Sequence, residues 1–119
     1  MSESKHPLAL GRKYSLGSNR QHQYVYRKGK SFPGRHLVLI YLKGRDLRLG
    51  VSASSKVGNA VVRNRIRRYM REDFRHVKNQ LKCGRYILLA RTSAPEAGHQ
   101  ALTRDLRAVL ERAKLFRDS

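Results

Sequence analysis

Cysteine and long apolar stretches are almost absent from this chain. Its single cysteine, Cys83, cannot form a disulfide within the chain, which suits a reducing compartment. No apolar run approaches the roughly 20 residues that a membrane-spanning helix needs, and we recognise no signal peptide at the start. We therefore expect a cytoplasmic protein without a membrane partner.

Acidic residues are also scarce, and this shortage has larger consequences. The chain has 8 Asp and Glu against 27 Lys and Arg, so its formal net charge is +19. In a compact fold the excess positive charges repel one another, and a bound polyanion relieves that repulsion. With 119 residues, of which 39% are hydrophobic, the chain can still form one core. These numbers favour a nucleic-acid-binding domain over a protein whose basic surface serves only solubility.

The shortage of acids argues against catalysis by the chain itself. A protein nuclease needs clustered carboxylates for metal ions, or a histidine pair for acid–base chemistry. Glu72 and Asp73 are neighbours on an expected helix and therefore point to different faces. The five histidines have no metal-ligand spacing, and one cysteine cannot complete a zinc site. We expect no catalytic residue, no bound metal and no cofactor in the protein alone.

The positive charge is concentrated in two regions. Residues 10–35 contain seven basic residues and no acid, and residues 59–82 contain eight basic residues against two acids. From Glu96 to the end, five basic residues face four acidic ones. Aromatic residues gather among the basic ones in the first third of the chain, a mixture that suits the bases and phosphates of single-stranded nucleic acid. We expect the polyanion to contact the first two regions and the last helix to pack elsewhere.

Periodicity predicts three elements in the first half of the chain. Residues 1–17 show no period, so we expect a flexible basic arm there, followed by a single domain at 18–119. A short helix begins after a cap at Ser18 or Asn19 and ends at Gly29. Apolar residues over 36–43 and alternation over 47–54 predict two strands, joined by a hairpin turn at 44–46.

Three further elements complete the pattern. Apolar residues recur at steps of three and four from Val62 to Leu81, which predicts a helix between an Asn59 cap and Gly84. Residues 85–91 are typical of a strand, and Pro95 opens a last helix. The order αββαβα predicts a two-layer α/β (α+β) sandwich, a small mixed sheet covered by helices. The strands on either side of the long helix can pair in parallel, and generic rules would make that crossover right-handed.

The long helix carries arginines opposite its apolar stripe. Guanidinium groups suit phosphate because their fork is planar, bidentate and always charged. A solvated, salt-bridged face would need acids at the same spacing, and only Glu72 and Asp73 are available. A helix-turn-helix would need a short helix and a tight turn directly before the long helix, whereas here the long helix lies between two predicted strands. The arginines are Arg63, Arg67 and Arg71 in one row, and Arg68, Arg71 and Arg75 with Asn64 in the next.

The stretch from Ser52 to Arg68 resembles the signature of the bacterial ribonuclease P protein family. Within it, Gly-Asn-Ala-Val-Val-Arg-Asn-Arg at 58–65 is specific in this strand–helix context. The resemblance covers roughly residues 16–115. It implies an α/β sandwich related to a ribosomal-protein domain, with an unusual left-handed βαβ crossover. On the handedness we follow the resemblance rather than the generic rule.

The resemblance also implies an activity and partners. In this family the catalyst is an RNA that uses Mg²⁺, and the protein is its partner subunit in removing the 5′ leader of precursor tRNA. It implies a monomer in a 1:1 complex with that RNA, with several side chains at positions that contact it. These residues are Lys56, Asn59, Arg63, Asn64, Arg65, Arg67, Arg68 and Arg71.

In the family, a cleft between the first helix, the sheet and the start of the long helix receives the single-stranded leader. Its floor carries two aromatic residues one helical turn apart, where this chain has His22 and Tyr26. The usual two lysines before Val-Gly-Asn are Ser55 and Lys56 here. The leader-binding residues that we expect are His22, Tyr26, Arg48, Ser52, Lys56 and Arg91. From the residues alone, the alternative is that His22 and Tyr26 are core residues of a short amphipathic helix.

Two other functions are compatible with parts of the sequence. A basic ribosomal or RNA-chaperone protein is what composition alone would favour, and it predicts tight binding to ribosomal RNA with no effect on precursor tRNA cleavage. A DNA-binding regulator predicts a preferred duplex sequence and a dimer interface. The sequence has neither a spare apolar helix face nor a heptad, so we expect no DNA partner.

Overall fold

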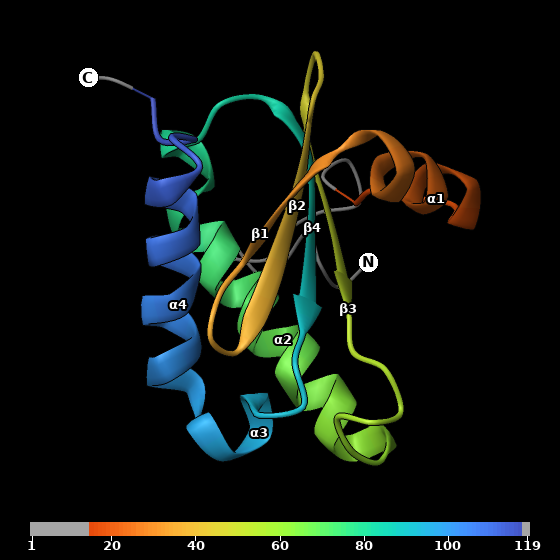
Figure 1. The fold of residues 1–119 in the computed structure, drawn as a ribbon, viewed down its shortest axis with the longest axis vertical. Coiled ribbons are helices and arrows are strands. Elements are labelled where there is room, and N and C mark those ends of the chain that lie inside the picture. The colour runs from red at the N-terminus through yellow and green to blue at the C-terminus, as the bar shows by residue number, and fades with distance from the viewer. Residues whose placement is uncertain (1–14, 118–119) are drawn as a thin grey trace, which may run out of the picture.

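The computed structural model describes residues 15–117, so most of the arm predicted at 1–17 lies outside the described residues. The predicted fold class is confirmed: a small mixed sheet is covered by helices (Figure 1). Two short elements, β1 and α3, add to the predicted order. In chain order the elements are α1 (Asn19–Lys28), β1 (Lys30–Pro33), β2 (Leu37–Lys43), β3 (Leu47–Ser52), α2 (Ala60–Val77), the 3₁₀-helix η3 (Lys78–Gln80), β4 (Gly84–Ala90), α3 (Ala94–Ala97) and α4 (His99–Arg112).

The four strands lie in the order β1-β2-β4-β3. β4 is antiparallel to β2 and parallel to β3, and it separates these two strands. The predicted hairpin at 44–46 is therefore wrong, because the strands that this loop joins are not neighbours. β4 occupies this inner position, and its Tyr86, Ile87 and Leu88 are fully buried because helices cover both faces of the sheet there. Its first amide, that of Gly84, donates to the carbonyl of Asp46 at 2.9 Å and so fixes the end of this loop to β4.

Helices cover the two faces of the sheet unequally. α2 and α4 pack over one face, against Leu39, Tyr86 and Leu88. The short α1 lies on the other face, where Val25 packs with Ile40 and Ile87. In Figure 1 β3 and β4 both run downward, and α2 passes behind the sheet as the chain moves from β3 to β4 on its left. This connection is left-handed, as the resemblance implied and against the generic rule.

Several element boundaries differ from the prediction. α2 ends at Val77 rather than at Gly84, and η3 follows, although Leu81 beyond both is still buried as predicted. Gly84 instead opens β4 with a φ of +155°, and a Cβ there would overlap the Tyr41 ring. The last helix is split, since Gly98 at φ +86° separates α3 from α4. β1 was not predicted, because Phe32 is its one half-buried residue and the strand has no alternation of apolar and polar residues.

Candidate nucleic-acid interface

α2 carries an apolar face and an arginine face. Asn59 caps the helix as predicted, and its Oδ1 accepts a hydrogen bond from the Val62 amide at 3.0 Å. Ile66, Met70 and Phe74 are buried in the core, which fixes the rotation of the helix about its axis. That rotation leaves the predicted RNA-contact side chains exposed or half-exposed. We call this set the arginine face: Arg63, Asn64, Arg65, Arg67, Arg68 and Arg71.

Neutral partners orient several of these arginines. Arg63 Nε donates to the carbonyl of Gly58 at 3.2 Å, and Arg67 donates to the side-chain oxygen of Asn64. The Arg68 guanidinium lies 5.6 Å from the centre of the Tyr69 ring. Partial desolvation of its guanidinium and, to a smaller extent, the charge of Arg67 lower the pKa of Arg71 below its ordinary value, although the residue as a whole is exposed. These contacts hold the side chains without neutralising their charge.

No arginine of α2 forms an ion pair with any residue in the described range 15–117. The carboxylates that do pair there are those of Asp46, Asp73 and Glu111, and their partners lie on β3, β4 and α4. A salt-bridged, solvated face is therefore not what the structure contains. An uncompensated cluster of guanidinium groups on one helix is a surface for phosphates.

The second predicted surface lies on the sheet face that carries α1. There the Tyr26 side chain forms a hydrogen bond with Ser52 of β3, while burial of the ring raises the pKa of Tyr26 above its ordinary value. His22 lies beside them, with Nδ1 3.0 Å from the carbonyl oxygen of Ser18. Its Nε2 is 2.5 Å from the point that a Cβ on Gly50 would occupy. Glycine at this place in β3 thus lets the imidazole approach the sheet closely.

His22 and Tyr26 are not core residues of α1, because Val25 is the one buried residue of this helix. Tyr26 is 37% exposed, and His22 is half-buried. The structure therefore brings together three of the predicted leader-binding residues, His22, Tyr26 and Ser52, on one partly open surface. We call this surface the sheet cleft.

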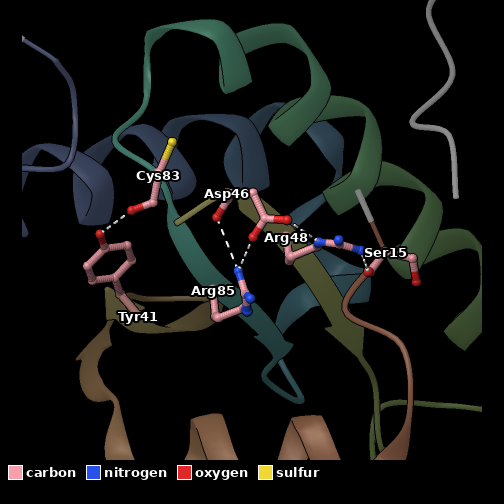
Figure 2. Close-up of polar contacts among 6 residues, drawn as sticks. All are labelled: Ser15, Tyr41, Asp46, Arg48, Cys83 and Arg85. Carbon is pink, nitrogen blue, oxygen red and sulfur yellow. Dashed lines mark hydrogen bonds and ion pairs between the residues drawn. The ribbon is translucent and has the colours of Figure 1, made fainter. Parts of the chain in front are cut away.

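The remaining predicted leader-binding residues are less close to one another. Arg48 points along the start of β3, where its Nε donates to Asp46 at 2.9 Å and its Nη1 to the carbonyl of Ser15 at 3.3 Å (Figure 2). Arg91 follows the end of β4, and its Nη1 donates to the carbonyl of Gly34 at 3.1 Å. Lys56 is exposed in the loop between β3 and α2.

Sequence reasoning missed the role of Asp46. Its carboxylate accepts from Arg85 Nη1 at 2.5 Å and from Arg48 at 2.9 Å, so one side chain connects the 44–46 loop to β3 and β4 (Figure 2). The hydrogen bonds from Arg85 and then Arg48 lower the pKa of Asp46. The sequence does contain an indication of this role, since Asp46 is the only acidic residue between Glu3 and Glu72.

Asp105 is a second acid with a structural role that the sequence did not reveal. It is buried on α4 and accepts from the backbone amides of Arg35, His36 and Leu37 at 3.0, 2.7 and 3.1 Å. It thereby fixes the turn between β1 and β2 to the helix layer. The sequence indicates this role by position: Asp105 comes three residues after Leu102 and so lies on the apolar side of the predicted last helix.

The two adjacent acids of α2 have separate environments, as predicted. Asp73 is buried and its Oδ1 lies 2.9 Å from both His99 Nε2 and Thr103 Oγ1, which joins α2 to α4. Glu72 is half-exposed and takes no part in these contacts. Within residues 15–117 no cluster of His, Cys, Asp and Glu could hold a metal ion. In the same range no helix is long and apolar enough to span a membrane.

Comparison with known proteins agrees with the geometry. The model of the family described as Ribonuclease P matches residues 10–114. The ribonuclease P protein component of Staphylococcus epidermidis is 40% identical over 106 residues, which cover 87% of this chain and 92% of the relative. That of a Nitratiruptor species is 36% identical over 100 residues, with coverages of 84% and 92%.

Solved structures give the same result. The RNase P protein of Staphylococcus aureus superposes with a TM-score of 0.82 at 34% identity, covering 87% of this chain and 98% of that one. The RNase P protein of Thermotoga maritima superposes with a TM-score of 0.74 at 27% identity, covering 82% and 96%. The fold, the arginine-bearing helix and these matches together place the chain in the ribonuclease P protein family.

Proposed function

We propose that this chain is the protein subunit of a ribonuclease P ribonucleoprotein, in which it binds the catalytic RNA and the 5′ leader of precursor tRNA. The observation that carries the proposal is the arginine face, whose guanidinium groups have no carboxylate partner among the described residues. Membership of the family supplies the context, since the curated relatives are ribonuclease P protein components.

In this proposal the arginine face binds phosphates of the catalytic RNA, together with Lys56 and Asn59 at its start. The RNA cleaves precursor tRNA with Mg²⁺, and the protein contributes positive charge and position rather than reacting groups. This division agrees with the chemistry of the described residues, where the acids of α2 are separated and Asp73 is engaged in holding α4. The complex contains one protein and one RNA and works in the cytoplasm.

The sheet cleft receives the unpaired leader in the same proposal. The Tyr26 ring offers a flat surface on which a base can stack, and His22 offers a smaller one. Lys56 and Arg91 supply charge for the phosphates at the ends of β3 and β4. Arg48 supports the leader site indirectly, because its contacts with Asp46 and Ser15 hold the start of β3 in place.

The test is reconstitution with RNA. The full chain is mixed with a bacterial ribonuclease P RNA, and removal of the leader from precursor tRNA is measured at a magnesium concentration at which the RNA alone is slow. We expect the protein to accelerate cleavage by offsetting repulsion between the two RNAs. No acceleration, combined with tight binding to ribosomal RNA, would instead identify a ribosomal or RNA-chaperone protein.

A further inference from the structure

A cavity of about 390 Å³ opens beside α1, on the flank of the helix that faces away from the sheet cleft. His22 of the cleft faces Gly50 on β3, whereas this cavity lies between α1 and the end of β2, with Leu42 and Lys43 in its lining. β4 separates β3 from β2, so the two surfaces are distinct. The volume lies within the range of about 300–1,000 Å³ that is typical of small-ligand sites.

The cavity has an apolar floor and a positive rim. Leu16, Val25 and Leu42 form the floor, and they belong to the small core under α1. Arg20 from α1 and Lys43 from β2 stand at the rim, both exposed. No Asp or Glu is among the lining residues of this cavity. An apolar floor beneath several cations fits a ligand that is both flat and anionic.

Arg85 is the third cation of the rim, and its place is fixed. Its Nη1 donates to the carboxylate of Asp46 at 2.5 Å and to the carbonyl of the same residue at 3.2 Å (Figure 2). That carboxylate is shared with Arg48, so one negative charge serves two guanidinium groups and the cluster stays positive. A Cβ on Gly44 would lie 3.1 Å from Arg85 Nη1, so glycine lets the loop close tightly on this arginine.

An aromatic side chain completes the site. Tyr24 lines the cavity and is 50% exposed, and the Arg27 guanidinium lies 5.9 Å from its ring centre. The proposed leader contacts make no use of this ring. An exposed ring next to an apolar floor and cationic side chains is the combination with which proteins bind unpaired nucleotides, through base stacking and phosphate contacts.

We propose that this cavity binds an unpaired nucleotide of RNA, with the base between Tyr24 and the apolar floor. The phosphate is bound by Lys43, Arg20 and Arg85. The site is a second RNA contact on the opposite flank of α1 from the sheet cleft. The inference rests on the proposed function for the class of ligand, RNA, but it uses none of the same side chains.

The experiment compares two matched pairs of variants of the full chain. Affinity for a fluorescein-labelled, single-stranded uridine octamer is measured at fixed salt concentration. Tyr24→Ala is compared with Tyr24→Phe, which keeps the ring, and we expect at least about fivefold weaker binding for the alanine variant from lost stacking. Lys43→Gln is compared with Lys28→Gln, which removes the same charge from α1 outside the cavity. We expect the loss for Lys43→Gln to be several times larger.

Equal dissociation constants within either pair overturn the proposal. Tyr26→Ala is measured in parallel, so that a loss there without any loss at Tyr24 removes the cavity and leaves the sheet cleft intact. A 4-thiouridine octamer provides a local readout, because its crosslink to Tyr24 should fall in Lys43→Gln and persist in Lys28→Gln.

Two further measurements identify the source of the nucleotide. Weaker binding of Lys43→Gln to the catalytic RNA alone assigns the nucleotide to that RNA. A loss seen only when the reconstituted enzyme binds precursor tRNA, and absent with mature tRNA, assigns it to the leader. If Lys43→Gln and Lys28→Gln behave alike in both measurements, the cavity has no role in the ribonucleoprotein and the proposal fails.

Discussion

At the scale of single residues, the side chains of α1 determine which surfaces this helix presents. Val25 points into the core, and the side chains before and after it divide between two flanks. On one flank His22 and Tyr26 stand over β3, where Gly50 leaves room for the imidazole. On the other flank Tyr24 stands beside the cavity. One short helix therefore presents aromatic side chains to two separate surfaces.

Tyr26 is the residue at which the leader hypothesis is most directly tested. Stacking on an aromatic side chain contributes about 1–3 kcal/mol per base. Tyr26→Ala should weaken binding of precursor tRNA to the reconstituted enzyme by up to that amount, while mature tRNA, which has no leader, should bind as before. Tyr26→Phe is the control, since it loses only the hydrogen bond with Ser52. Equal weakening of precursor and mature tRNA would move the leader path elsewhere.

Asp46 should make stability depend on pH in the acid range. Its hydrogen bonds from Arg85 and Arg48 lower its pKa below the ordinary value of 3.8, so the folded state binds a proton less readily than the unfolded state. The stabilisation is therefore complete above the ordinary pKa and disappears as the pH falls through the lower, folded value. Asp46→Asn should lower the melting temperature at pH 7, and the difference from the parent should shrink below pH of about 4.

The measurement for Asp46 is thermal unfolding followed by circular dichroism at pH 7, 5 and 3 on otherwise identical samples. Glu111→Gln is the matched control, because the exposed Glu111 contacts Arg107 only at 3.9 Å and such surface pairs contribute little. A pH-independent difference between Asp46→Asn and the parent would contradict the assignment.

At the scale of elements, α2 and the parallel pairing of β3 with β4 on either side of it were predictable, whereas the partner of β2 was not. The apolar period, the Asn59 cap and the arginine rows are local patterns, and the structure has all three. The antiparallel pairing of β2 with β4 joins residues 41 to 53 positions apart, and a local pattern cannot reveal it. The Asp46 and Asp105 contacts are long-range in the same sense. The arginine rows followed from the spacing along α2, whereas the leader-binding residues came from family resemblance and the cavity beside α1 has no local sequence pattern.

The arginine face should determine how binding depends on salt. Each phosphate contact that is lost reduces the slope of log affinity against log salt concentration by about one unit. Arg65→Ala and Arg68→Ala should each weaken binding to the catalytic RNA and flatten that slope, as measured by filter binding over a salt series. Arg104→Ala, an equal change of charge at an exposed position of α4, is the control. A variant that carries both substitutions is measured in the same way. If it has the parent's affinity and slope, the arginine face does not bind RNA.

The acids of α2 should be dispensable for the cleavage step. Glu72→Gln and Asp73→Asn should leave the single-turnover rate of the reconstituted enzyme nearly unchanged when RNA is saturating. Asp73→Asn keeps the oxygen that His99 and Thr103 contact, so the junction of α2 with α4 can persist. Thermal unfolding of each variant shows whether it is folded. A large loss of rate in a folded variant would mean that the protein takes part in the chemistry.

At the scale of the whole molecule, three of the eight acidic side chains serve the fold. The exposed Asp46 and the buried Asp73 and Asp105 each hold a loop or a helix in place, and few other acidic residues remain to balance the basic surface. In a domain of this size, repulsion among the charges behind a net charge of +19 destabilises the folded state. Binding of a polyanion should therefore stabilise the fold as well as form a complex.

This prediction is tested by melting the full chain with inorganic tripolyphosphate and with sodium chloride at the same ionic strength. Saturation at 100 times the dissociation constant contributes about 2.7 kcal/mol, which for a domain of this size raises the melting temperature by roughly 10 °C. We expect tripolyphosphate to give a clearly larger increase than chloride. Identical melting temperatures would show that screening alone relieves the repulsion.

The inner position of β4 has a consequence for synthesis of the protein. β4 is the last strand to be translated, yet it lies between β2 and β3 in the finished sheet. A nascent chain can form α1, the β1–β2 pair and much of α2 while β3 still has no strand beside it. Translation must continue past residue 90 before the sheet can close. A copy that stops earlier therefore displays the arginines of α2 without the completed sheet against which that helix packs.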